Sequence, residues 1–245
     1  MSPDFAEPLD RAKLDIFLYG PPGSGKTTAA CSAPGPILVL NAEPGNPLRF
    51  ARHRHGKDAI RELPVTGAST LLEAYLYLKD GEGGEQTVVV DSLSEVYRAV
   101  LRDFSGGHRP QIQHYLDTQT KIEDYCRTLI DLPQNVVLIA HEGRVKDEDE
   151  GYFERLPLTG TKNPALGGKL MAMVDIVAYC GRAEPEAEGE SDRFLGQLYD
   201  GNGRRGKDRG LAGREKFEEL NLTAWVEAEQ AALAAAEESN DGGEK

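Results

Sequence analysis

A glycine-rich segment near the start of the chain carries residue types that bind phosphate. Residues 20–27 read Gly-Pro-Pro-Gly-Ser-Gly-Lys-Thr and fit the pattern G-x-x-x-x-G-K-[ST] at every position. The glycines allow successive backbone N–H groups to turn inward, and a following helix adds the positive end of its dipole. Lys26 supplies a charge for β- and γ-phosphates, and the Thr27 hydroxyl can coordinate Mg²⁺. The alternative is a turn that only joins two elements. The predicted phosphate-binding residues are Gly20, Pro21, Pro22, Gly23, Ser24, Gly25, Lys26, Thr27 and Thr28.

Acidic residues follow two apolar segments and could complete this chemistry. Asp91 ends the β-branched run 87–90, where the carboxyl end of a parallel strand would present it as a second Mg²⁺ ligand. Its alternative role is helix capping, which Ser92 serves better. Hydrolysis also needs a carboxylate that orients water, and the residue after Asp91 is not a glutamate. Glu43, which follows another apolar strand, is the better candidate, with a surface acid as its alternative. Glu95 is the glutamate nearest to Asp91, but its spacing from Ser92 is that of a capping box, which gives it a structural role instead.

The elements that must position these residues alternate along the chain. Short apolar runs predict strands at 14–19, 37–40, 59–65, 87–91 and 136–141. Amphipathic helices lie between them, with capping boxes at Thr70/Glu73 and Ser92/Glu95. Residues 142–168 are polar and punctuated by glycine and proline, which predicts a loop or hairpin. Two later strands, 174–179 and 194–199, are expected to be antiparallel. The prediction is an α/β fold whose mostly parallel central sheet is covered by helices on both faces.

The 245 residues suffice for one such domain. We expect an N-terminal arm at 1–12, a core at 13–212, a helical segment at 213–238 and a disordered acidic tail at 239–245. The three cysteines lack CxxC spacing, no apolar run is long enough to span a membrane, and no secretory signal is visible, so a cytoplasmic location is predicted. The net charge of −13 argues against a protein that coats nucleic acid with its whole surface, while a local basic groove is compatible with it.

The chain resembles the RecA-type recombinase core in four motifs. These are Lys26-Thr27, Asn41-Ala42-Glu43, the apolar strand that leads into Asp91-Ser92, and a fourth strand that ends in a polar residue. That family places its catalytic glutamate in an Asp-Ala-Glu-like segment, which Asn41-Ala42-Glu43 matches at its last two positions. It ends its fourth strand in a glutamine that senses γ-phosphate, whereas this chain has His141, a residue that can titrate near neutral pH. Over residues 12–212 the chain is similar to phage-encoded RecA-like ATPases of the single-strand annealing type. The resemblance implies ATP and Mg²⁺ as ligands, Glu43 as the residue that orients water, and His141 as the phosphate sensor.

A basic pair further along the chain also matches that family. Lys207 and Arg209 flank Asp208 after a glycine-rich stretch. In RecA-like filaments a pair at this distance from the core reaches the γ-phosphate of a neighbouring subunit, so the resemblance implies self-association into a ring or filament. The alternative is a solvated basic turn.

RecA-type proteins bind DNA with two loops, whose positional equivalents here are 105–110 and 143–169. Tyr152 and Phe153 could stack on bases. Against this, the acidic run 147–150 would repel phosphate, and a solvated loop stays the alternative. The predicted DNA-binding residues are Arg109, Arg144, Lys146, Lys162 and Lys169.

The sequence therefore predicts an ATPase that binds single-stranded DNA and promotes annealing or recombination, with a single-strand binding protein or another replication protein as a further partner. Two other functions stay open. One is a nucleotide-dependent switch or loader in which Glu43 is incidental. The other is a small-molecule kinase, because residues 20–27 also resemble those of nucleoside monophosphate kinases, although no compact set of arginines for a lid is found.

Overall fold

Six strands form the parallel part of one sheet. The computed structural model describes residues 13–56, 58–81, 83–146, 153–160, 165–183 and 193–241. The parallel strands are β1 (Asp15–Gly20), β2 (Ile37–Asn41), β3 (Ile60–Pro64), β4 (Thr87–Asp91), β5 (Asn135–Lys146) and β7 (Ile176–Ala183), in the spatial order β7-β1-β5-β4-β2-β3. The strands β1, β2 and β4 are buried along their whole length, as expected for strands with helices over both faces. The predicted parallel sheet is confirmed.

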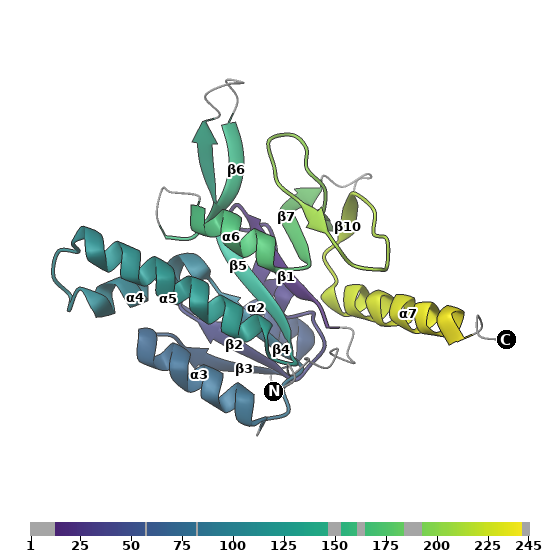
Figure 1. Ribbon diagram of the computed structural model, residues 1–245, viewed down its shortest axis with the longest axis horizontal. Coiled ribbons are helices and arrows are strands. Elements are labelled where there is room, and N and C mark those ends of the chain that lie inside the picture. Colours follow the sequence, from purple (N-terminus) through teal and green to yellow (C-terminus); the bar gives the residue numbers. More distant parts are fainter. Residues whose placement is uncertain are drawn as a thin grey trace, which may run out of the picture.

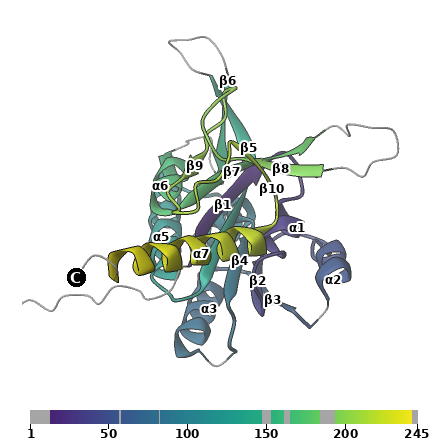
Figure 2. The same ribbon diagram turned by 90° about the vertical axis from the view of Figure 1, so that its right-hand side faces the viewer.

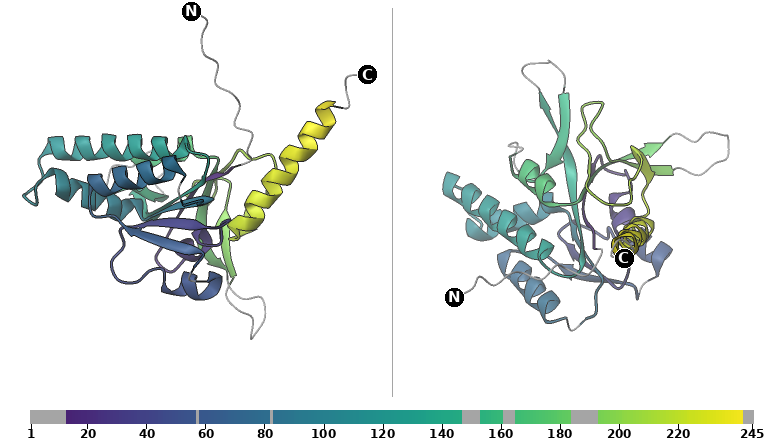
Figure 3. Two further views of the ribbon diagram at one scale, coloured as in Figure 1. Left: turned by 90° about the horizontal axis from the view of Figure 1, so that it is seen from below. Right: turned by 45° about the vertical axis from the view of Figure 1, so that its right-hand side comes forward.

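Helices cover both faces of this sheet (Figures 1 and 2). One face packs against α3 (Ala68–Asp80), α4 (Leu93–Phe104), α5 (Ile112–Ile130) and α6 (Ala165–Met173), and the other against α1 (Lys26–Ala30), α2 (Arg49–His55) and α7 (Leu222–Asp241). The side chains of β1 alternate between the two cores: Phe17 and Tyr19 join the first, while Ile16 and Leu18 join the second. Figure 3 shows α7 lying apart from the α4–α5 pair, on the opposite side of the sheet.

Antiparallel strands extend the sheet beyond its parallel part. β6 (Phe153–Leu158) pairs with the distal half of β5, and this β5–β6 hairpin projects upward in Figure 1. β8 (Arg193–Gln197) pairs with β7, β10 (Phe217–Glu219) with β8, and β9 (Lys207–Asp208) with the start of β7. The predicted antiparallel strands toward the C-terminus are confirmed.

Several predicted boundaries were wrong. β5 runs on from His141 to Lys146, because pairing with β6 satisfies its polar half. Residues 142–168 were predicted as a loop or hairpin, and the pairing of β5 with β6 confirms a hairpin there. The helix α6 occupies the end of this segment; its glycines hid the signal, but Leu166 and Leu170 bury one face. The predicted helical segment 213–238 begins only at Leu222, and α7 then continues to Asp241 into the predicted tail. The arm 1–12 and residues 242–245 lie outside the described part.

Both predicted capping boxes were also wrong. α3 begins at Ala68, whose N–H donates to the Asp103 carboxylate, so Thr70 lies inside the helix. Ser92 is the N-cap residue of α4 but makes no capping hydrogen bond with its side chain, and Glu95 pairs with Arg98 instead. No helix in the described ranges is both long enough and apolar enough to cross a membrane.

Candidate nucleotide-binding site

The predicted phosphate loop lies between the carboxyl end of β1 and the start of α1. Glycine is required at Gly20, because a Cβ atom there would lie 2.4 Å from the carbonyl oxygen of Cys180. Gly25 caps α1 with a φ of 83°, in the left-handed region that favours glycine. The Lys26 ammonium folds over the loop and donates to the carbonyl oxygens of Gly20 (2.9 Å) and Pro21 (2.8 Å). Burial lowers the pKa of Lys26. Phosphate oxygens can replace these carbonyls as partners of the ammonium.

Thr27 and Asp91 meet beside this loop. The Thr27 hydroxyl donates to Asp91 Oδ2 at 2.7 Å, and Asp91 is 2% exposed. Burial raises the pKa of this carboxyl. Because Mg²⁺ takes oxygen ligands and is usually held by few protein groups together with water and substrate phosphates, this hydroxyl and carboxylate fit a Mg²⁺ ion.

A second carboxylate, Glu43, lies in the same pocket with two hydrogen-bond partners. Glu43 Oε1 accepts a hydrogen bond from the Ser92 hydroxyl and lies 3.0 Å from His141 Nε2. The hydrogen bond to His141 is the largest cause of the lowered pKa of Glu43, and that from Ser92 contributes in the same direction. Glu43 is therefore ionised at neutral pH and is held in one orientation, as a residue that orients a water molecule requires.

The strand order explains why these side chains converge. β5 lies between β1 and β4, so His141, which pairs with Gly20, lies between the phosphate loop and Asp91. β2 is the other neighbour of β4, with Asn41 opposite Asp91, which places Glu43 at the same edge. One pocket is lined by Pro22, Gly23, Ser24, Gly25, Lys26, Thr27, Thr28, Glu43, Pro44, Pro47, Phe50, Arg54, Asp91, Ile139, His141 and Phe194.

Comparison with known families agrees with this arrangement. A family model described as an AAA domain matches residues 12–209. The chain belongs to this AAA domain family. The family is one of P-loop NTPases, so the predicted P-loop ATPase is confirmed at this level, and with it a nucleotide-binding function. No curated protein matches the chain. The narrower assignment of the AAA domain to phage RecA-type recombinases stays a prediction.

The AAA domain takes its candidate catalytic glutamate from a different strand than its candidate metal-binding aspartate. Many AAA-type ATPases have a glutamate directly after that aspartate, whereas here the next residue is Ser92, joined to Asp91 by a cis peptide bond. The Ser92 hydroxyl donates to Glu43, which follows β2. The carboxylate therefore enters the pocket from the neighbouring strand.

The basic pair Lys207 and Arg209 binds carbonyls of its own chain. Lys207 Nζ donates to the carbonyl oxygen of Met171 at 2.6 Å, and Arg209 Nη2 to that of Val174 at 2.8 Å. These carbonyls lie in and just after the last turn of α6, where cations are favourable. Because β9 pairs with the start of β7, the pair lies near the sheet edge opposite the phosphate loop of the same AAA domain. A role at a neighbour's phosphate stays a prediction.

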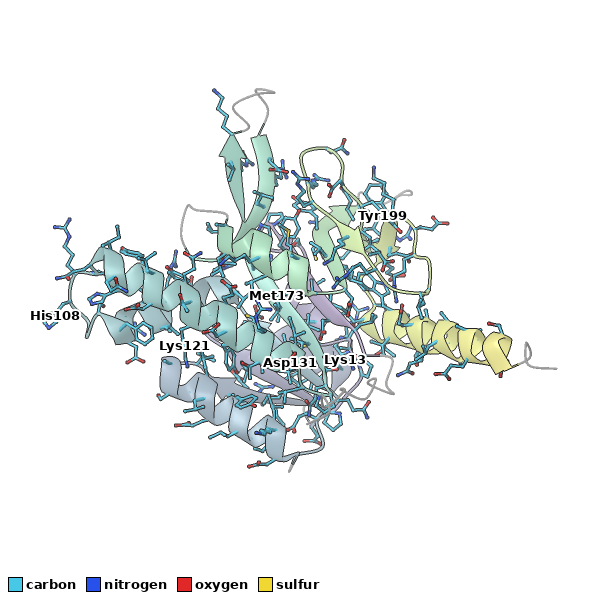
Figure 4. All side chains as sticks on the ribbon, in the orientation of Figure 1. Lys13, His108, Lys121, Asp131, Met173 and Tyr199 are labelled. Carbon is cyan, nitrogen blue, oxygen red and sulfur yellow. The ribbon has the colours of Figure 1, made fainter. Side chains whose placement is uncertain are left out.

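The predicted DNA-binding residues do not form one cluster. Arg144 and Lys146 are exposed and lie two residues apart on β5, so they share a face of the hairpin. The Lys169 ammonium instead pairs with Glu123 at 2.6 Å. Arg109 lies in the α4–α5 turn beside His108, which Figure 4 labels at the far left, away from the hairpin. Lys162, Tyr152 and the acidic run 147–150 lie outside the described residues.

Two serines of the site were missed as functional residues. Ser92 orients Glu43, and Ser94 Oγ accepts a hydrogen bond from the His141 N–H while it donates to the carbonyl oxygen of Leu158. Ser94 therefore ties α4 to both strands of the hairpin. Two serines within three residues after the candidate metal-binding aspartate are a usable signal, but the capping-box spacing concealed it.

Proposed function

We propose that the AAA domain is a Mg²⁺-dependent ATPase that acts on single-stranded DNA and promotes its annealing. The observation that supports hydrolysis is the convergence of Lys26, the Thr27–Asp91 pair and the Glu43–His141 pair on one pocket. A binding module needs only the first two of these features. An oriented, ionised carboxylate beside them serves the attack of water on phosphate.

Each residue has a distinct role in this proposal. The loop amides and Lys26 bind the phosphates, and Thr27 and Asp91 hold Mg²⁺, which when bound neutralises charge on the phosphate oxygens. Glu43 orients the water and takes up its proton. His141 donates to Glu43, so it lies where the presence of a γ-phosphate can be sensed.

The DNA-binding part of the proposal depends on continuity within β5. His141 and the cationic pair Arg144 and Lys146 belong to the same strand, so a displacement of His141 is passed along a paired hairpin to these cations. The resemblance to RecA-type proteins supports this assignment and also self-association, with Lys207 and Arg209 acting on a neighbouring copy.

ATPase assays with and without single-stranded DNA test the proposal. We expect Glu43→Gln to bind ATP and to hydrolyse it on the order of 100-fold more slowly. Glu95→Gln is the matched control, since Glu95 pairs with Arg98 and not with a residue of the pocket, and its turnover should be normal. DNA should stimulate the wild-type protein.

Four outcomes contradict the proposal. Normal turnover in Glu43→Gln, or no turnover in the wild type, favours the switch or loader. Phosphoryl transfer to a nucleotide without DNA favours the kinase. Hydrolysis unaffected by DNA removes the DNA part alone.

A further inference from the structure

Three arginines from separate segments lie side by side at the β5–β6 hairpin. Arg144 of β5 is directly opposite Arg155 of β6, and Arg155 forms a parallel bridge with Arg204 of the loop 199–206. Directly paired residues of neighbouring strands point to the same face, and neighbouring strands are about 4.8 Å apart. Arg144, Arg155 and Arg204 therefore form a row on one face of the hairpin, called here the arginine row.

Groups of the chain itself neutralise this row only in part. Arg155 Nη1 donates to the Tyr179 hydroxyl at 2.8 Å and lies 3.7 Å from the Glu142 carboxylate. Arg204 lies over the Tyr179 ring, 4.3 Å from its centroid, and has no carboxylate within ion-pair distance in the described ranges. Its Nε atom is buried without a partner there. Arg144 is exposed and, among the described residues, makes no ion pair.

Arg205, which follows Arg204 in the sequence, is instead paired with acidic side chains. Arg205 is paired with both Glu154 and Asp200. Glu154 precedes Arg155 in β6 and therefore points to the other face of the hairpin. The backbone N–H of Arg205 donates to the Tyr19 hydroxyl, which in turn donates to its carbonyl oxygen, so the loop is fixed to the strand that ends in the phosphate loop. The face that carries Glu154 therefore has two carboxylates for one arginine, whereas Glu142 is the one carboxylate within ion-pair distance of the arginine row among the described residues.

Like charges directly opposite one another destabilise a sheet, so an anionic ligand would stabilise a row that is neutralised only in part. Three arginines whose backbones lie about 5 Å apart on three segments match a chain of closely spaced phosphates better than one small anion. We propose that the arginine row binds the phosphate backbone of single-stranded nucleic acid, with Arg155 and Arg204 as contacts alongside Arg144. This inference rests on the proposed function and extends its DNA-binding surface to the loop 199–206.

Binding of a fluorescent dT30 oligonucleotide, measured by anisotropy at several salt concentrations, tests the proposal. Arg204→Gln should weaken binding several-fold and lower the slope of log K against log salt by about 0.7, the value for one phosphate contact to a single strand. Arg205→Gln, one residue away, is the matched control and should leave the slope unchanged. Arg144→Gln, at an exposed site, should behave like Arg204→Gln, which keeps the test valid if Arg204→Gln does not fold.

Equal slopes in wild type, Arg204→Gln and Arg144→Gln would overturn the proposal, as would an Arg205→Gln variant that loses as much affinity. Preference of the wild type for poly-glutamate over dT30 would also overturn it, in favour of an acidic protein partner. ATP binding is measured in parallel for each variant. If the wild type binds ATP and dT30 but the three proteins have equal salt slopes, the assignment of the arginine row is wrong and the proposed function stands. If the wild type binds no ATP, the proposed function is wrong.

Discussion

Glu43 shows how neighbouring side chains set the chemistry of a single residue. Its carboxylate accepts a hydrogen bond from Ser92 and contacts His141, and both lower its pKa. Because these contacts stabilise its ionised form, the Glu43 carboxylate stays deprotonated to lower pH than an ordinary glutamate. Activity that needs ionised Glu43 should therefore persist into mildly acidic solution.

Replacing His141 should raise the pH below which activity is lost. In His141→Phe the Glu43 carboxylate loses its strongest stabilising partner, so its pKa rises and the acid limb of the kcat/KM profile shifts to higher pH. Ser92→Ala should shift the limb in the same direction by less, because the Ser92 contribution is smaller. The measurement is the pH dependence of ATP hydrolysis for the three proteins. An acid limb that stays in place in His141→Phe would show that Glu43 is not the titrating group.

Among single residues, the sequence predicted those that belong to one local motif and those that follow neighbouring parallel strands. Lys26 and Thr27 belong to one motif, and Asp91 and Glu43 follow parallel strands, whose carboxyl ends meet. The contacts of Ser92 and Phe194 were not predicted. Ser92 has two hydrogen-bonding choices, and Phe194 reaches Gly25 only through the pairing of β7 with β8.

Among the elements, β1 carries a buried acid that makes its stability depend on pH. Asp15 is 4% exposed, its N–H donates to Asp175, and Lys13 Nζ lies 3.3 Å from its carboxylate. Burial raises the pKa of Asp15 to about 6. Because the folded-state pKa exceeds the unfolded one, the folded state binds the proton more tightly. The stabilisation from this group is therefore present at low pH and is lost as pH rises through about 6.

Asp15→Asn should remove this dependence. The variant should be more stable than the wild type at pH 8, by up to about 3 kcal/mol, and should lose that advantage near pH 4, where the wild-type carboxyl is protonated. Urea unfolding at pH values from 4 to 8 measures the difference. A difference in the free energy of unfolding that does not vary with pH would contradict the assignment.

A buried ionic cluster fixes α7 to the sheet. Arg214 donates to Asp208 at 3.2 Å and to Glu229 of α7 at 3.0 Å, and all three side chains are less than a tenth exposed. Glu229 also accepts a hydrogen bond from the Leu211 N–H. The arginine is the counter-ion of two carboxylates that would otherwise be buried without one.

Arg214→Ala should therefore destabilise the protein by about 3–5 kcal/mol, the cost of leaving buried charges unpaired. Arg98→Ala is the control, because the Arg98–Glu95 pair is exposed and should contribute about 0–1 kcal/mol. The free energies of unfolding in urea compare them. Equal losses for the two variants would show that the cluster does not stabilise α7.

Elements with one strong signal were predictable, and those that depend on a partner were not. The buried strands β1, β2 and β4 were located because a run of apolar residues specifies them. The outer half of β5 is polar and is a strand only because β6 pairs with it. In α6 a Gly-Gly pair lowers helix propensity, and burial of Leu166 and Leu170 against the core overrides it.

The molecule as a whole is acidic, with a net charge of −13, yet it keeps cations at defined places. Some are neutralised by their own chain, such as Lys169, and some bind carbonyls, such as Lys207 and Arg209. The arginine row is less neutralised than either group. Nucleic acid should therefore meet one face of the hairpin, and the rest of the acidic surface should repel it.

Self-association predicts how turnover depends on protein concentration. If Arg209 acts on a neighbour's phosphate, specific ATPase activity should rise with protein concentration, and Arg209→Gln should abolish the rise while ATP binding is kept. If Arg209 serves only the end of α6, the variant should lose stability and show the concentration dependence of the wild type. Specific activity measured over a hundredfold range of concentration, with thermal unfolding beside it, separates the two roles.

The central claim is that Lys26, Thr27 and Asp91 form a site for a nucleoside triphosphate with Mg²⁺. Calorimetric titration of ATP into the wild type and Asp91→Asn, each with and without Mg²⁺, tests it most directly. The account predicts one ATP per chain, tighter binding with Mg²⁺ in the wild type, and little effect of Mg²⁺ in the variant. No binding to the wild type, or an equal gain from Mg²⁺ in both proteins, would contradict it.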